Sequence, residues 1–159
     1  MTHAIPAHEV FVHPFVRPDH WEIADLWTAS WTGMPDMRPH DRHDWLFSHI
    51  EALHEAGART LCALNRRTGG IAGFATLDPG KGKLLRIVVA NTARGSGVAS
   101  ALMDQCKRLS PGGLELTLEA DNARALRFFE REGFSASAGV PVEVQGAAPT
   151  RVTLRWRTQ

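Results

Sequence analysis

Apolar and polar residues follow two different periods along this chain. Four segments place apolar side chains three or four residues apart, the period of a helix that packs one face against a core. Capping residues or glycines bound these segments, and the predicted helices span residues 20–30, about 41–57, 98–109 and about 122–133. Shorter segments are β-branched or alternate apolar with polar residues, as strands do; they span residues 9–15, 59–64, 71–77, 84–90, 114–119, 140–144 and 151–156. This order predicts an α/β (α+β) domain in which helices pack on one mixed sheet.

The central feature is a strand, a glycine turn and a helix between residues 84 and 109. The apolar run at 84–90 predicts a buried strand, and Gly95 and Gly97 follow it. Glycines let a ligand approach the backbone. The first N–H groups of a helix lack partners inside the helix and carry the positive end of its dipole. The turn therefore suits an anion such as a phosphate.

Other interpretations of this turn remain open from the residues alone. The turn could join the strand to the helix and bind nothing. A dinucleotide-binding fold would place Glu119 against a ribose, but Ser100 stands where its third glycine belongs and only one βαβ unit is present. A nucleotide P-loop is set aside because no Gly-Lys-Ser/Thr sequence follows Gly97.

Length and composition narrow the class of protein. A chain of 159 residues with 43% apolar and 22% charged residues suits one soluble globular domain. The sequence shows no apolar run of bilayer length and no signal-peptide pattern at its N-terminus. Its two cysteines, Cys62 and Cys106, fall in a predicted strand and a predicted helix. We therefore expect a cytoplasmic protein that acts without a membrane. A net charge of +1 argues against nucleic acid as a partner.

Charged and aromatic residues are unevenly distributed. Residues 1–57 hold three Arg, no Lys and nine Asp or Glu, a net charge of −6, and residues 58–159 carry a net charge of +7. All eight His and four of the five Trp also lie before residue 58. The split predicts an acidic, aromatic surface and a basic surface suited to a polyanion. Compositional drift, with the tryptophans in the core, is the alternative.

Two motifs connect the glycine turn to a known family. The sequence RGSGVA at residues 94–99 fits the pattern Arg/Gln-x-x-Gly-x-Gly/Ala, and NARALRFFEREGF follows at residues 122–134. Together they resemble the GNAT N-acetyltransferase superfamily, whose members bind acetyl-CoA. The resemblance implies one acyltransferase domain over residues 1–159, with an acetyl-CoA-binding core at 84–134 and acceptor-side helices at 1–57. It also implies a mostly antiparallel sheet of six to seven strands that splays in the middle and is flanked by about four helices.

By this resemblance, the co-substrate acetyl-CoA lies along the strand before the glycine turn. Its pantetheine bonds the backbone of Ile87, Val88 and Val89, and the Val89 N–H polarises the thioester carbonyl as a small oxyanion hole. The backbone N–H groups implied to hold the pyrophosphate belong to Arg94, Gly95, Ser96, Gly97, Val98 and Ala99. The implied contacts on the following helix are Asn122 near the pantetheine, Ala125, Phe128 and Phe129 as a wall, and Arg131, with Arg127 as a second candidate, at the 3′-phosphate. Helix capping by Asn122 and solvation of both arginines are the structural alternatives.

The chain departs from the family at the catalytic acid. Family members commonly have a Tyr where Phe129 stands, and this chain has no Tyr. The usual proton donor to the departing thiolate is therefore absent. Candidates for the base are Glu119, at the end of its strand, and His40 and His43, on the loop before the second helix. For Glu119 the alternative is a strand residue that only faces solvent. No metal is predicted, because the two histidines lack a third and a fourth ligand.

The acceptor is expected against the N-terminal third of the chain. Its acidic charge and the faces of Trp27 and Trp31 favour an ammonium group. This predicts a small cationic amine, an amino-acid-like molecule or a peptide N-terminus, which attacks acetyl-CoA directly. The alternative function is a non-catalytic acyl-CoA-binding or regulatory domain that has lost the acid. A homodimer is expected only by analogy with relatives.

Overall fold

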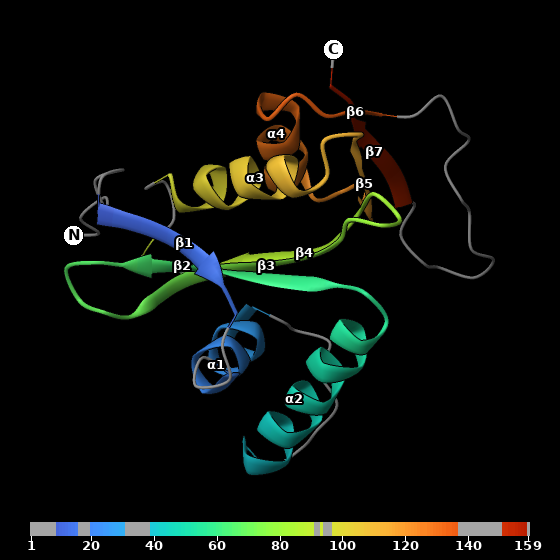
Figure 1. Cartoon of the computed structure of the whole chain (residues 1–159). Helices are drawn as coiled ribbons and strands as arrows, with labels where there is room; N and C mark the ends of the chain where they lie inside the picture. The colour runs from blue at the N-terminus through green and yellow to red at the C-terminus, as the bar shows by residue number, and fades with distance from the viewer. Residues whose placement is uncertain are drawn as a thin grey trace.

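The computed structural model describes residues 9–15, 20–30, 39–90, 93, 97–136 and 151–158. Within them the chain forms one seven-stranded sheet in the order β1-β2-β3-β4-β5-β7-β6, together with four helices (Figure 1). The strands are β1 (Val10–Pro14), β2 (Arg59–Asn65), β3 (Ile71–Asp78), β4 (Lys83–Val89), β5 (Leu114–Glu119), β6 (Ser135–Ala136) and β7 (Arg151–Trp156). The helices are α1 (His20–Ser30), α2 (Pro39–Glu55), α3 (Val98–Leu109) and α4 (Ala123–Arg131). Among the strands that the structure describes, only β4 and β5 pair in parallel, so the predicted mixed, mostly antiparallel fold is confirmed.

Helices cover both faces of the sheet (Figure 1). We call them the α3 face, which α3 and α4 cover, and the α1 face, which α1 and α2 cover. On the α3 face, Leu102 and Met103 are fully buried in the larger core. On the α1 face, Trp27 packs on Phe74 of β3 with ring centroids 6.3 Å apart. Because both faces are covered, all eight residues of β3 are buried.

Most predicted elements are confirmed at or near their predicted ends. The bounds of α1, α3, β5 and β7 are those predicted. Helix α2 begins earlier, at Pro39, because proline suits the first turn of a helix, where its missing N–H would have no partner anyway. The predicted strand at 140–144 lies outside the described residues. In the described part, β7 pairs with β5 and with the short β6.

The sheet splays between β4 and β5. Lys83 with Glu115 is the single pairing of these two strands in the described part of the chain. Strand β5 instead pairs with β7 along all six of its residues. From Lys83 towards Val89, β4 therefore has β3 on one side and the splay on the other.

A β-bulge interrupts β4 close to its start. The register against β3 shifts between Leu84 and Arg86, so Leu85 has no residue opposite it. Leu85 is 41% exposed, so the prediction of a continuously buried strand was wrong at this position. The bulge places Leu84 on the α3 face and Arg86 and Val88 on the α1 face.

The two cysteines are buried side chains of the fold. Cys62 and Cys106 are buried and form no disulfide. Burial raises the pKa of the Cys106 thiol to about 12, so it stays protonated and unreactive at neutral pH. Separately, none of the helices that the structure describes has the length and apolar character to cross a membrane.

Candidate active site

Part of the backbone of β4 faces the splay. The Ala90 N–H donates to a carbonyl of β3 at 2.8 Å, and residues of an antiparallel pair alternate between facing the partner strand and facing away. The backbone groups of Val88 therefore face β3, and those of Ile87 and Val89 face the splay. The implied pantetheine contacts need one correction, because the backbone of Val88 already faces β3 and cannot bond a ligand in the splay.

The glycine turn leads from this strand into the start of α3. Gly97 caps the helix with φ +85°, a left-handed conformation that favours glycine. A Cβ at Gly97 would meet no described atom within 4 Å. The first turn of α3 holds no acidic residue, and Gly97 has no side chain to bond its first N–H groups. This geometry suits an anion. Of the other implied pyrophosphate contacts, Val98 and Ala99 lie in α3, and Arg94, Gly95 and Ser96 lie outside the described residues.

Phe129, at the position of the missing Tyr, is a core residue. It is 4% exposed and lies edge-on between Phe128 and Phe134, at centroid distances of 5.1 and 5.3 Å. A Tyr hydroxyl buried here would need a hydrogen-bond partner, which Phe129 does not. Phe129 can offer a ligand only a small surface, whereas Phe128 is half-buried.

The start of α4 has a clear structural role. The Asn122 side chain accepts a hydrogen bond from the Ala125 N–H at 3.3 Å, so the capping interpretation of Asn122 holds. Ala125 is half-buried, and Arg127 and Arg131 are exposed on the helix. The two arginines are thus accessible to a phosphate in solution.

Glu119 lies on the α1 face at the end of β5. The leucines of β5 join the core on the α3 face, so the alternating residues Glu115 and Glu119 point to the other face. Glu119 is exposed and is paired in register with Arg151 of β7. Glu115 is opposite Lys83 in a parallel pair. When the bulged Leu85 is left out of the count, Glu119 lies at the level of Val88 across the splay.

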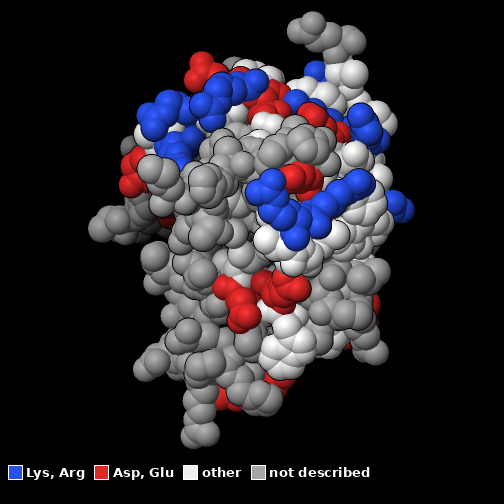
Figure 2. All heavy atoms as spheres, turned by 90° about the vertical axis from the view of Figure 1, so that its left-hand side faces the viewer, with Lys and Arg blue, Asp and Glu red and all other residues white. Residues whose placement is uncertain are grey.

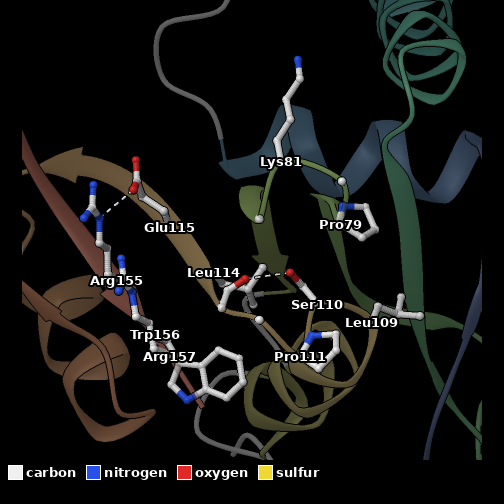
Figure 3. A pocket seen from close by; sticks show the side chains of 14 residues that line it. Pro79, Lys81, Leu109, Ser110, Pro111, Leu114, Glu115, Arg155, Trp156 and Arg157 are labelled. Carbon is white, nitrogen blue, oxygen red and sulfur yellow. Dashed lines mark hydrogen bonds and ion pairs between the residues drawn. The ribbon is translucent and has the colours of Figure 1, made fainter. Parts of the chain in front are cut away.

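The hollow in Figure 3 lies at the closed end of the splay. It has a volume of about 390 Å³ and is lined by the β3–β4 turn, the loop between α3 and β5 and the last residues of β7. The Arg155 Nε donates to Glu115 at 2.7 Å, and the Ser110 hydroxyl donates to the Gly113 carbonyl at 2.7 Å (Figure 3). Polar groups of the wall thus bond one another. The hollow lies at the opposite end of β4 from Gly97, so it is distinct from the predicted anion site.

The splayed strand and the glycine turn fall within one family match. A sequence model described as the acetyltransferase (GNAT) family matches residues 20–134. The chain belongs to the GNAT acetyltransferase family. The match runs from the start of α1 to just past α4 and contains both motifs. Enzymes of this family use acetyl-CoA.

Solved structures share the fold of this GNAT acetyltransferase at low sequence identity. A candidate acetyltransferase of the GNAT family from Desulfovibrio desulfuricans is 22% identical, with a TM-score of 0.70 over 93% of this chain and 98% of that chain. A spermidine N-acetyltransferase from Vibrio cholerae, in complex with CoA and spermine, is 16% identical, with a TM-score of 0.71 over 94% and 96%. A GCN5-related N-acetyltransferase from Kribbella flavida is 16% identical, with a TM-score of 0.68 over 95% and 99%. These identities establish a shared fold.

The predicted acceptor residues of the GNAT domain need correction. Trp27 is 2% exposed, and the guanidinium carbon of Arg86 lies 4.0 Å from its ring centroid. The ring is therefore a core element that cannot present a face to an acceptor, and its assignment to the acceptor surface was wrong. His40 and His43 lie in α2 and not on a loop; their side chains, and all of Trp31, lie outside the described residues.

Arg86 is a candidate site residue that the sequence analysis missed. It lies on the α1 face of β4 and is half-buried. Burial lowers the pKa of its guanidinium, which remains charged at neutral pH. The signal was present in the sequence, because Arg86 is the one charged residue in the apolar run at 84–90.

Charge is separated on the face of the domain in Figure 2. Lys and Arg side chains gather in its upper half, the half that contains α3 and α4 in Figure 1, and the charged side chains described in its lower half are acidic. On α1, Glu22 and Asp25 are both exposed. The Glu22 carboxylate also accepts from the Ile71 N–H at 2.8 Å, which ties α1 to β3. This arrangement supports an acidic surface on the side of α1.

A chain of hydrogen bonds crosses the sheet on the α1 face. The His54 Nε2 and Thr60 Oγ1 atoms are 2.8 Å apart, and Thr60 Oγ1 lies 2.9 Å from Thr76 Oγ1. Thr76 is paired in register with Arg86. Burial lowers the pKa of His54, and the nearby Glu51 carboxylate opposes that shift. His54 also lines a hollow of about 430 Å³ between the ends of β1 and α2.

We expect His54 to make the domain less stable in mild acid. Its pKa is lower in the folded chain, so the unfolded chain takes up a proton first, near pH 6.5. The free energy of unfolding should therefore fall as the pH drops through about 6.5 and level off below the folded pKa. Urea unfolding at several pH values, on the wild type and on His54→Gln, measures this contribution. The variant should lose less stability in acid, and equal losses would contradict the prediction.

Proposed function

We propose that this GNAT domain transfers the acetyl group of acetyl-CoA to a primary amine by direct attack. The amine belongs to a small cationic amine, an amino-acid-like molecule or a peptide N-terminus. The observation that best supports the proposal is the edge of β4 at the splay, where Ile87 and Val89 turn their backbone groups away from β3. The start of α3 lies at the end of the same strand.

The described residues fit acetyl-CoA. The amides of a pantetheine arm can bond a free strand edge as an added strand does, which suits Ile87 and Val89. A pyrophosphate suits the first N–H groups of α3, because they lack partners in the helix and Gly97 has no side chain to bond them. Arg131, with Arg127 beside it, is exposed for a 3′-phosphate.

The proposed mechanism uses two groups on either side of the splay. Acetyl-CoA, when bound, supplies an activated thioester. The Val89 N–H donates a hydrogen bond to the carbonyl oxygen and stabilises the negative charge that develops there. Glu119 accepts a proton from the amine, directly or through a water molecule, so that the nitrogen can attack the carbonyl carbon. A C–N bond forms and the C–S bond breaks. Because Phe129 has no proton to give, the proton that the nitrogen loses on forming the amide passes to the thiolate through water.

Phe129 also supports a second candidate function. A non-catalytic acyl-CoA-binding or regulatory domain needs the strand edge and the glycine turn, but neither an acid nor a base. Such a domain would bind CoA and show no dependence on Glu119.

Turnover measurements separate the two functions. The protein is incubated with acetyl-CoA and a panel of primary amines while free thiol is followed. We expect thiol release with at least one amine, above the rate without amine. Glu119→Gln should slow it, and the loss should shrink as the pH approaches the pKa of the amine, because more acceptor then arrives deprotonated.

Glu115→Gln is the matched control for this assay. It removes a carboxylate from the same strand and face, at a residue that is bonded to Arg155, and it should leave turnover unchanged. Tight CoA binding without turnover across the panel would contradict the enzymatic proposal and favour the non-catalytic domain.

A further inference from the structure

The α1 face of β4 carries a half-buried arginine, Arg86. Between the bulge and the glycine turn, β4 places Arg86 and Val88 on this face. Val88 is 7% exposed and belongs to the core. Helix α3 packs on the opposite face of β4, and Glu119 is exposed on the α1 face, so we place the approach of the acceptor to the splay on the α1 face. Arg86 is therefore the polar side chain of β4 that lies beside its path.

The orientation of Arg86 is restricted. Its guanidinium carbon lies 4.0 Å from the centroid of Trp27. Trp27 is in turn held between Phe74 and His49, with centroids 6.3 and 5.5 Å away. Stacking engages the flat face of a guanidinium, whereas its five N–H donors lie in the plane of the group. Two of these donors match the two oxygens of a carboxylate.

An opposite charge lies across the splay. Glu119 of β5 is exposed on the same face and lies at the level of Val88, which follows Arg86 on the α1 face of β4. The exposed carboxylates of Glu22 and Asp25 on α1 add negative charge to this side of the domain. In a molecule with both an ammonium and a carboxylate, the ammonium could face Glu119 and the carboxylate could face Arg86. A polyamine would bring a cation against Arg86, which is unfavourable.

We propose that Arg86 binds a carboxylate of the acceptor, and that the acceptor is an amino acid or a similar molecule whose carboxylate lies close to its amine. The inference rests on the proposed function, and it selects the amino-acid-like class from the three acceptor classes given there. Arg86 acts as the specificity residue, and Glu119 faces the amine.

Matched pairs of acceptors test this assignment. Each amino acid is assayed beside its α-carboxamide, which keeps the amine and removes the charge. The wild type should prefer the acid. Arg86→Met keeps an unbranched side chain on Trp27 and should lower kcat/KM for the acid about 10- to 100-fold, mainly through KM. The carboxamide should be unaffected.

Arg66→Met is the matched control. The Arg66 guanidinium also lies over an aromatic ring, 5.0 Å from the centroid of Phe11, but at the β2–β3 hairpin. The Arg66→Met variant should keep the wild-type preference for the amino acid over its carboxamide. Efficient turnover of carboxamides, with Arg86→Met equal to the wild type, would overturn the inference while the acetyl-transfer proposal stands.

A binding measurement tests the inference without turnover. The Tm of the CoA-loaded protein is measured with each amino acid. A rise in the wild type and in Arg66→Met, absent in Arg86→Met, would support carboxylate binding even if no acetylation occurs. If no amino acid raises the Tm of the wild type, the inference fails whatever the outcome of the turnover assay.

Discussion

Gly97→Glu is expected to weaken the binding of acetyl-CoA by at least about 100-fold, or about 2.7 kcal/mol. The Cβ of residue 97 points into open space among the described atoms, so the carboxylate can lie at the start of α3. This carboxylate would repel the pyrophosphate proposed there. It would also accept hydrogen bonds from the N–H groups that the pyrophosphate would otherwise bind. The left-handed φ of +85° adds about 1–2 kcal/mol of strain. Titration calorimetry with acetyl-CoA measures the loss.

Gly57→Glu controls for both the charge and the strain. Gly57 has φ +105° and open space at its Cβ position. It precedes β2, whose first residue is paired with Leu77, towards the opposite end of the sheet from Val89. This variant should therefore bind acetyl-CoA like the wild type. If Gly97→Glu and Gly57→Glu have the same affinity, the pyrophosphate assignment is lost.

Local sequence patterns predicted the helices and strands well, because the spacing of apolar residues that distinguishes them lies within one continuous segment of the chain. Helix α3 is an example: Val98, Leu102 and Cys106 recur at helical spacing, and all three are buried. The same argument covers β5, whose leucines alternate with polar residues and join the core on one face. Such patterns also predict which face of an element is apolar, but not what lies against it.

The parts of the site that depend on strand register could not be predicted from the local sequence. The backbones of Ile87, Val88 and Val89 were implied to bind alike, and the position of β3 separates Val88 from the other two. Burial of Trp27 depends on α1 packing over β3, and the contact of Trp27 with Arg86 joins two distant segments. Neither period nor composition carries this information. An isolated charge in an apolar strand is nevertheless a useful warning that a site is near.

Gly73 had no assigned role in the sequence, and the structure predicts a large effect there. A Cβ at this position would lie 2.7 Å from the Val88 carbonyl oxygen, 3.2 Å from Val98 Cγ1 and 3.3 Å from Leu102 Cδ1. The first contact is with backbone, so β3 and β4 would have to move apart. Gly73→Ala should cost about 2–3 kcal/mol of folding free energy and lower the Tm by about 5–10 °C. Because Gly73 is paired with Val89, the affinity for acetyl-CoA should fall as well. Thermal unfolding and calorimetry measure the two losses.

Gly70→Ala shows whether this loss is steric. Gly70 precedes the same strand, its φ lies outside the left-handed region, and its Cβ would make ordinary contacts of 3.5 Å with Thr68 and 3.9 Å with Glu22. The methyl group should change stability by no more than about 0.5 kcal/mol and leave acetyl-CoA binding intact. If Gly73→Ala behaves the same way, β4 and α3 can move to make room for the methyl group without a loss of folding free energy. The close approach at Gly73 then does not set the position of Val89. If it loses stability but keeps full affinity, the pairing with Val89 supports the fold alone, and the strand edge proposed to bind acetyl-CoA tolerates the shift.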